Sequence, residues 1–318
     1  MLNEGGCVSL VSKVKVSVCV VTYNQEAFIG DCLDSIVNQK TDFDFEVIIS
    51  DDCSTDKTAE IIQEYANKYD FIRPISRDFN VGAGANYFNA HSLAIGEYVC
   101  HCDGDDMFLP GKLQEQANLL DSHPLYSMST HAVNVIGSDE IIGSAPGLPE
   151  VANVEELVTL GTYFVHSSVM YRRNLRPAYP KGFQAVDFYV YIDMAINGPI
   201  HLDKSVYGCY RKHSGGVSSN PLYKAKIESF YREAYELAIR LGVNEDVVRN
   251  AQVKNNMSFS LARCFNGDYI GFKQLILLTI EDYPYANSFH RFLHFTRHFS
   301  LIARGLNLAK KIKHKLLN

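Results

Sequence analysis

Short apolar runs alternate with amphipathic stretches along the first hundred residues of the chain. Val16 to Val21 is an unbroken run of apolar or small side chains rich in β-branched residues, which predicts a strand covered on both faces. From Ala27 to Val37 the apolar residues recur at helical spacing, and Glu46 to Ile49 predicts a second short strand. The pattern therefore begins as strand, helix, strand.

The same alternation continues further along the sequence. A helical pattern around Ile62 is followed by a predicted strand over Phe71 to Ile75, a loop over Asn80 to Gly84 and a helix through Tyr87 to Ala94. Another strand then runs into a cluster of acidic residues. Strands and helices alternating at this length predict an α/β protein with an open, Rossmann-like, mostly parallel sheet flanked by helices.

The remaining sequence is less regular. Strands are predicted over Ser127 to Val133, Tyr163 to Tyr171 and Ser205 to Arg211, and the Gly- and Pro-rich stretch Gly137 to Pro149 is interpreted as a mobile loop near the site. From about Lys224 onward the pattern is helical. The prediction is one α/β domain over residues 1–220 and a helical C-terminal region over residues 221–318.

The end of the chain combines positive charge with apolar residues. From His290 to Asn318 there are seven Lys or Arg and no acidic residue, interleaved with Phe, Leu and Ile. Such a basic amphipathic tail can lie on the anionic inner face of the plasma membrane. The alternative is a helix docked on the domain with a solvated basic face, and the sequence leaves both open.

Three carboxylates lie within four residues, at Asp103, Asp105 and Asp106, directly after the predicted strand through Tyr98 to Cys100. Carboxylates this close repel one another and raise each other's pKa unless a cation neutralises them. The cluster therefore indicates a site for a hard divalent metal, as a bound diphosphate would require. A solvated acidic loop is the alternative.

Polar residues also follow the first two strands, at Thr22 to Asn24 and at Asp51 to Ser54. In open α/β sheets ligands bind beyond the carboxyl ends of the strands. We therefore expect these two segments and the acidic cluster to meet at one crevice.

Composition narrows the class of protein. The chain has 318 residues, 47% of them hydrophobic, which is enough for a sizeable core, and its net charge of −6 argues against nucleic-acid binding. The eight cysteines include no Cys-x-x-Cys pair, and Cys100 and Cys102 are interpreted as small core residues. No secretory signal and no membrane-spanning apolar run is evident, so a reduced, cytoplasmic location is expected.

Taken in order, five segments resemble those of the inverting family 2 glycosyltransferases with the GT-A fold, many of which act in bacterial surface-polysaccharide assembly. The resemblance covers roughly residues 14 to 220 and rests on the segments Val18 to Asn24, Ser50 to Asp56, Asn80 to Gly82, Gly96 to Tyr98 and Asp103 to Asp106.

The resemblance implies a binding site for a nucleoside-diphosphate sugar. Residues implied to contact the donor are Thr22, Tyr23, Asn24, Asp51, Asp52, Asn80, Gly82, Asn86, Asp103, Asp105 and Arg211. Asp51 matches the carboxylate that accepts a hydrogen bond from the base, usually uracil N3, and Asp52 supports its turn. A role for both in a polar turn that caps the next helix is the alternative.

The acidic cluster matches the metal-binding motif of the family. The resemblance implies Mn²⁺ or Mg²⁺ as cofactor, held by carboxylates of the run Asp103, Asp105 and Asp106 that also contact the ribose, with Asp105 and Asp106 as the preferred metal ligands. It further implies that His213 completes the metal shell and that Arg211 lies near the diphosphate. A divalent cation there would stabilise the charge that develops on the leaving diphosphate.

Inversion at the anomeric carbon requires a carboxylate that takes a proton from the acceptor hydroxyl. The segment from Asp187 to Gly198 resembles the family's helix that begins with this base, and Asp187 is the predicted base. A helix N-cap is the alternative role for Asp187, and Asp193 is the rival base.

Three sites depart from the commonest family pattern, the first being Val186, which stands where the family usually has a glutamate before the base. Tyr87 stands where many members carry an arginine, and Met107-Phe108 stands where related members carry a Tyr-Trp pair.

The prediction is a metal-dependent inverting glycosyltransferase that moves a sugar from a nucleoside diphosphate, UDP being favoured, to a saccharide or lipid-linked saccharide acceptor. One rival is a sugar-phosphate nucleotidyltransferase, but the Gly-rich, Arg-containing loop that it needs after the first strand is absent from Thr22 to Gln25. The other is a pseudo-transferase that binds a nucleotide sugar or glycan without catalysis.

Overall fold

The computed structural model describes residues 14–180, 182–213, 221–281, 288–297 and 305, and the chain divides into two compact units. The first unit comprises residues 1–152, 163–184 and 197–214, and the second comprises residues 153–162, 185–196 and 215–318. The α/β domain ending at residue 220 stays a prediction.

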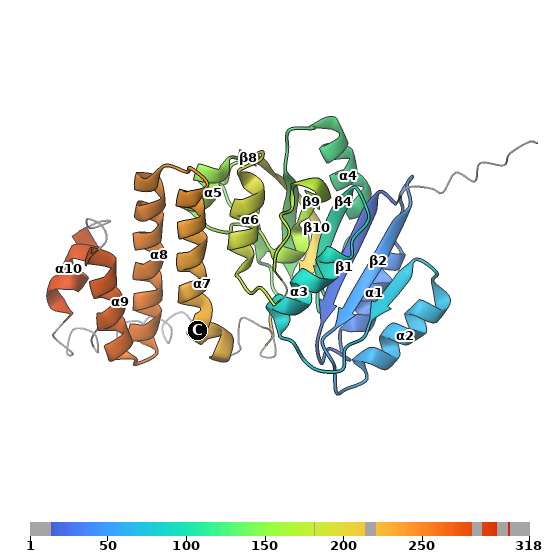
Figure 1. Cartoon of the computed structure of the whole chain (residues 1–318), viewed down its shortest axis with the longest axis horizontal. Helices are drawn as coiled ribbons and strands as arrows, with labels where there is room; N and C mark the ends of the chain where they lie inside the picture. The colour runs from blue at the N-terminus through green and yellow to red at the C-terminus, as the bar shows by residue number, and fades with distance from the viewer. Residues whose placement is uncertain (1–13, 181, 214–220, 282–287, 298–304, 306–318) are drawn as a thin grey trace, which may run out of the picture. The chain divides into compact units, whose positions relative to one another are not determined.

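The first unit is built on one mixed sheet (Figure 1). Its strands are β1 (Val16–Thr22), β2 (Phe45–Asp51), β3 (Ile72–Ile75), β4 (Tyr98–Asp103), β5 (Met107–Phe108), β6 (Met128–Val135), β7 (Ile141–Ile142), β8 (Val151–Ala152), β9 (Met170–Arg172) and β10 (Ile200–Tyr210). They lie in the order β3-β2-β1-β4-β9-β6-β10-β5, with β7 beside β6 and β8 beside β10.

The half of the sheet formed by β3, β2, β1 and β4 is entirely parallel. Parallel neighbours require crossover connections, and the helices α1 (Ile29–Val37), α2 (Thr58–Lys68) and α3 (Ala83–Ser92) provide them. Strand β9 enters antiparallel between β4 and β6, which pairs in parallel with β10. The predicted α/β class with a mostly parallel sheet is confirmed.

Alternation along the central strands decides which face each helix covers. Val16, Val18 and Val20 pack with apolar residues of α1, α2 and α4 (Lys112–Ser122) in one core cluster. Cys19 points to the other face, where its Sγ contacts the carbonyl oxygen of Ala90 in α3. Both faces of β1 are therefore covered, as its unbroken apolar run predicts.

One predicted strand is largely wrong. Within Tyr163 to Tyr171 only Met170 and Tyr171 belong to β9, and His166–Ser168 form a short 3₁₀ helix, η1, with a second, η2, over Arg173–Leu175. The side chains of Ser167 and Ser168 hydrogen-bond to groups at the strand ends and in the turn itself, so they do not alternate as strand residues would. The predicted loop Gly137 to Pro149 contains the short strand β7 and is otherwise irregular.

The second unit is helical. It contains α5 (Val154–Leu160), α6 (Asp187–Ala195), α7 (Pro221–Arg240), α8 (Glu245–Phe265), α9 (Tyr269–Glu281) and α10 (Ser288–Thr296). Cys264, Phe272, Ile276 and Leu293 form a small core that joins the last three of these helices. The helical character predicted from about Lys224 is confirmed, whereas most of the predicted basic tail lies outside the described residues.

Cys100 and Cys102 are fully buried, as predicted. In the part of the chain that the structure describes, none of the helices has the length and apolar character needed to span a membrane.

Candidate functional site

The carboxyl ends of β1, β2 and β4 are tied together by backbone hydrogen bonds. Asp52 N–H donates to the Thr22 carbonyl at 3.0 Å, and Gly104 N–H donates to the Val21 carbonyl at 2.9 Å. Because β1 lies between β2 and β4, the three polar loops that follow these strands meet at one edge of the sheet. The predicted convergence is confirmed.

The loop after β1 is held to the loop after β2. Asn24 has a left-handed backbone with φ of 51°, and its N–H donates to Ser54 Oγ at 2.8 Å. Its side-chain Oδ1 accepts from Thr55 N–H at 2.7 Å. Thr22 is buried and donates to Gln25 Oε1 at 2.7 Å, whereas Tyr23 is 46% exposed. Of this segment, Tyr23 and Asn24 are the exposed residues.

Asp51 lies at the end of β2 and is 8% exposed. Its carboxylate accepts hydrogen bonds from the hydroxyl and the backbone N–H of Ser54, so the polar-turn role is present. Burial raises the pKa of Asp51 above its ordinary value, and the bonds from Ser54 oppose that rise. The start of α2 is served instead by Asp56, which accepts from Thr58 N–H at 3.0 Å.

Asp52 organises the next loop. Its two carboxylate oxygens accept from the N–H groups of Val81 and Gly82, at 2.8 and 2.9 Å. Asn80 Nδ2 donates to the Asp52 carbonyl at 3.0 Å, and Gly82 has a φ of 88°, a conformation that favours glycine. Asp52 therefore shapes the Asn80 to Gly82 segment through direct contacts.

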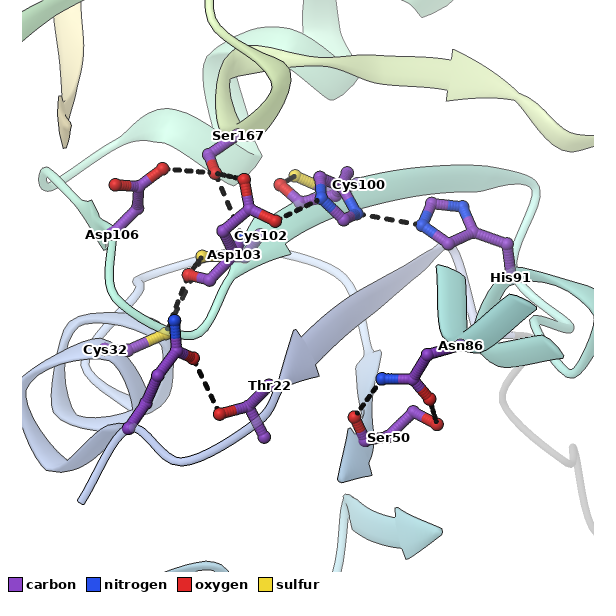
Figure 2. A network of polar contacts seen from close by, with 12 residues as sticks. Thr22, Cys32, Ser50, Asn86, His91, Cys100, Cys102, Asp103, Asp106 and Ser167 are labelled. Carbon is purple, nitrogen blue, oxygen red and sulfur yellow. Dashed lines mark hydrogen bonds and ion pairs between the residues drawn. The ribbon is translucent and has the colours of Figure 1, made fainter. Parts of the chain in front are cut away.

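Asn86 is buried in α3 and turned towards β2 (Figure 2). Its side chain exchanges two hydrogen bonds with Ser50, accepting from Oγ at 2.6 Å and donating to the carbonyl at 2.8 Å. Arg77 Nε also donates to Asn86 Oδ1 at 3.1 Å. The neighbouring Tyr87 packs its ring on His91, with 4.0 Å between centroids. In this unit the side chain of Asn86 thus braces the sheet.

Asp106 is the deepest of the three acidic residues, at 1% exposure. Its Oδ2 accepts from Ser167 Oγ at 2.5 Å (Figure 2). Its Oδ1 accepts from Arg211 N–H at 2.9 Å. Each oxygen of an ionised carboxylate retains a second lone pair, so these bonds leave capacity for a further contact.

Asp105 lies closer to the surface, with its side chain 13% exposed, and its Oδ2 is 2.6 Å from His213 Nε2. The guanidinium of Arg211 donates to the Asp105 carbonyl at 3.0 Å and lies 4.5 Å from the ring of Phe28. The imidazole of His213 packs on the same ring at 5.0 Å. The predicted ligands Asp105 and His213 are therefore neighbours, although 108 residues separate them.

Burial and mutual repulsion act on this cluster together. Burial raises the pKa of Asp105, with a further rise from the Asp103 charge, and the pKa of Asp106 is raised well above its ordinary value for the same two reasons. Over the described ranges, no three His, Cys, Asp or Glu side chains form a ready metal-binding group. The donor types do fit a hard divalent cation, because carboxylate oxygens and an imidazole nitrogen lie side by side and a cation would offset their crowded charge.

Two residues that the sequence did not single out, Ser167 and Lys112, hold the acidic cluster in place through buried hydrogen bonds. Ser167 in η1 accepts from Asp103 N–H at 3.0 Å and donates to Asp106. Lys112 is fully buried, donates to the Ser167 carbonyl and lies 3.9 Å from the centre of the Phe108 ring. A buried ammonium requires such partners. The Pro-Gly pair before Lys112 indicates only that a helix begins there. No local sequence pattern indicates that Lys112 is buried and bonded to Ser167.

Gly104 explains the glycine inside the acidic run. A Cβ at this position would lie 2.5 Å from Gln25 Oε1 and 2.8 Å from Thr22 Cβ, which is closer than real Cβ contacts. The loops after β1 and β4 pack so tightly here that only glycine leaves both in place.

Asp187 belongs to the second unit, where it is the first residue of α6 and is exposed. The N-cap position is Val186, so Asp187 does not occupy the alternative N-cap role. Burial, with a smaller contribution from the Asp187 charge, raises the pKa of the nearby Tyr231. Asp193 lies further along the same helix and is half-buried.

The part of the chain that carries the acidic cluster is similar to known proteins. The sequence profile described as Glycosyl transferase family 2 matches residues 17–176, which include β1 to β4 and the acidic cluster. The chain belongs to glycosyltransferase family 2. The predicted family membership is thereby confirmed.

Among relatives, the uncharacterized protein Rv1520 of Mycobacterium tuberculosis is 38% identical over 209 residues, which are 64% of this chain and 60% of that protein. The chain thus spans less than two thirds of the length of this relative.

Two solved structures share the GT-A fold. Staphylococcus aureus TarS 1-349 in complex with UDP-GlcNAc superposes with a TM-score of 0.66 at 21% identity, covering 93% of this chain and 89% of that one. The mannosyltransferase PcManGT from Pyrobaculum calidifontis in complex with GDP-Man and Mn²⁺ has a TM-score of 0.54 at 15% identity, covering 95% and 89%. At these identities the likeness concerns the fold alone.

Proposed function

We propose that this protein is a metal-dependent, inverting glycosyltransferase that moves a sugar from a UDP-sugar to a hydroxyl of a saccharide or lipid-linked saccharide acceptor, in the synthesis of a surface polysaccharide. The observation that carries the proposal is the meeting of the Asp51 turn and the Asp103 to Asp106 turn at one edge of a family 2 sheet. One turn suits a nucleoside and the other suits a cation with a diphosphate.

Donor recognition is assigned to the loops of the first unit. Asp51 would accept a hydrogen bond from the N–H of the base, and the exposed ring of Tyr23 would lie against the base or ribose. Asp103, whose side chain is 35% exposed, would accept from a ribose hydroxyl. Asp52, Asn80, Gly82 and Asn86 would hold the pocket in shape through the contacts described above.

Asp105, Asp106 and His213 would hold the metal, Mn²⁺ or Mg²⁺, and Arg211 would face the diphosphate. When bound, the cation supplies Lewis-acid stabilisation of the leaving diphosphate. The chain's own contribution to the chemical step is Asp187, which would accept the proton of the acceptor hydroxyl as the new bond forms.

A thermal-shift screen tests the proposal as a whole. Saturating UDP with Mn²⁺ is expected to raise the melting temperature of the full chain by about 5 °C, because a ligand that binds only the folded state stabilises it. UDP-GlcNAc and other UDP-sugars are tested as candidate donors. GDP-mannose and CTP, which carry other bases, test whether the site is selective for uracil.

The pattern of shifts separates the rivals. A shift with UDP that disappears with EDTA supports the proposal, and release of UDP in the presence of an acceptor distinguishes a transferase from a binding pseudo-transferase. A shift with a sugar 1-phosphate and nucleoside triphosphate, but none with UDP, would point to a nucleotidyltransferase. Equal shifts with all nucleotides would remove the assigned role of Asp51.

The C-terminal tail supports a second, separable proposal. We propose that its basic residues bind the anionic inner leaflet, where a lipid-linked acceptor lies. Replacing Lys310, Lys311, Lys313 and Lys315 by glutamine in the full chain is expected to reduce co-sedimentation with phosphatidylserine vesicles by about 10-fold or more. Neutral phosphatidylcholine vesicles are the control. Undiminished binding of the variant to anionic vesicles would contradict the membrane role.

A further inference from the structure

Three buried side chains form a continuous hydrogen-bonded bridge that ends on Asp103. The Tyr171 hydroxyl lies 2.8 Å from His91 Nδ1, and His91 Nε2 lies 2.9 Å from His101 Nδ1. His101 Nε2 then lies 3.2 Å from Asp103 Oδ1. In Figure 2 His91 lies to the right of Asp103, and dashed lines lead from one to the other. The three residues Tyr171, His91 and His101 are called the histidine bridge below.

The bridge lies in the interior and draws on separate elements. Tyr171 comes from β9, His91 from α3 and His101 from β4, and none of the three is more than 2% exposed. Placing two imidazoles and a phenol in a core is costly unless their polar atoms are paired. Apolar side chains of similar size in place of these three residues would stabilise the sheet equally well. The polar groups of the bridge therefore indicate a role other than stabilising the fold.

The protonation states of the side chains limit which atom donates and which accepts in each hydrogen bond of the bridge. Burial lowers the pKa of His91 well below its usual range and raises the pKa of Tyr171, so His91 is neutral and the phenol keeps its proton. A neutral imidazole donates through one nitrogen and accepts through the other. With a neutral imidazole at His101 as well, the donors along the bridge all run in the same direction, whereas an imidazolium at His101 would donate to both of its neighbours.

The carboxylate of Asp103 decides that direction. An ionised carboxylate only accepts, so His101 Nε2 must carry the proton that faces Asp103 Oδ1. His101 Nδ1 then accepts from His91 Nε2–H, and His91 Nδ1 accepts from the Tyr171 hydroxyl. The opposite order would set a bare ring nitrogen against a carboxylate oxygen at 3.2 Å, which is repulsive.

We propose that the histidine bridge is a positioning device, which delivers a single oriented N–H to Asp103 and holds its carboxylate in the rotamer that meets the donor ribose. The proposal rests on the proposed function for the role of Asp103, but the bridge itself is a property of the folded chain. Tyr171, His91 and His101 touch neither substrate nor metal in this assignment, and they act only through Asp103.

Two measurements on the full chain test the bridge. Long-range ¹H–¹⁵N spectra of protein labelled at histidine are expected to show His91 and His101 as Nε2–H tautomers, assigned with the variants His91→Gln and His101→Gln. Calorimetry with UDP and Mn²⁺ is expected to give a dissociation constant about 10-fold higher for His101→Leu than for the wild type. His101→Gln, which can present an amide N–H to Asp103, should recover most of that loss.

The control is His131→Gln. His131 is also fully buried, in β6, but its Nδ1 contacts the Ala132 carbonyl and it takes no part in the bridge. Tyr171→Phe keeps the ring and removes only the terminal hydroxyl, so it should disturb the tautomer of His91 without loss of fold. If His101→Leu does not fold, Tyr171→Phe tests the bridge in its place.

The possible outcomes are separable. An Nδ1–H tautomer or an imidazolium at His101, or unchanged UDP affinity in a folded His101→Leu, would overturn the bridge. If the wild type binds no UDP with any metal, the proposed function fails, and the histidine spectra then decide for or against the bridge by themselves.

Discussion

Asp187→Asn is expected to reduce turnover by about 100-fold or more while leaving affinity for the donor within a few-fold. Asparagine has nearly the shape of aspartate but cannot take a proton from the acceptor hydroxyl, so only the chemical step loses an essential group. Turnover is measured as UDP release in the presence of acceptor, with the donor that the thermal-shift screen selects. Donor affinity is measured separately by calorimetry.

Asp193→Asn is the matched control, because Asp193 lies on the same helix and loses the same charge. It is expected to keep turnover close to that of the wild type. If Asp193→Asn instead loses activity and Asp187→Asn does not, the base is Asp193. Near-normal turnover in both variants would remove α6 from the proton transfer altogether.

Asp105→Asn is expected to abolish the part of UDP binding that depends on Mn²⁺. Asp105 is half-buried beside Asp103 and its carboxylate contacts His213, so an amide would remove both the negative charge and an oxygen ligand from the centre of the assigned metal site. Calorimetry of UDP with Mn²⁺ and again with EDTA measures this part directly. Asp106→Asn should show a similar loss, together with lower stability, because its bonds from Ser167 and Arg211 are also disturbed.

Asp70→Asn provides the control for charge. Asp70 is exposed in the turn before β3, at the opposite edge of the sheet, and its replacement should leave both titrations unchanged. UDP affinity that is the same with and without Mn²⁺ in the wild type would contradict the metal assignment. Because protons compete with the cation for carboxylates of raised pKa, Mn²⁺ affinity should also weaken as pH falls through those pKa values.

Local patterns predicted the parallel half of the sheet well. The run Val16 to Val21 is β1 almost to the residue, and Glu46 to Ile49 lies inside β2. Both are short apolar runs bounded by turn residues, and such runs can be recognised as buried strands from the sequence alone. The stretch Tyr163 to Tyr171 is also predicted as a strand, but only its last two residues belong to β9. Its middle forms η1, where Ser167 hydrogen-bonds to Asp106 and to the backbone of Asp103.

The candidate site divides in the same way. Asp51, Asp103, Asp105 and Asp106 could be named from the sequence because carboxylates directly after buried strands are conspicuous. Ser167, Lys112, His91 and His101 could not, because each looks locally like an ordinary core or helix residue. Their importance comes from contacts across 10 to 64 positions of sequence, such as His91 with His101 and Ser167 with Asp103.

By itself the sequence determined the α/β class, the family and the cluster of carboxylates, because apolar periodicity and crowded acidic residues are properties of neighbouring residues. Only the tertiary structure decided how that charge is held. Asp106 faces Ser167, Asp105 faces His213 and Asp103 faces the histidine bridge because the sheet order places β4 between β1 and β9. Burial makes each of these contacts strong, and burial depends on the whole fold.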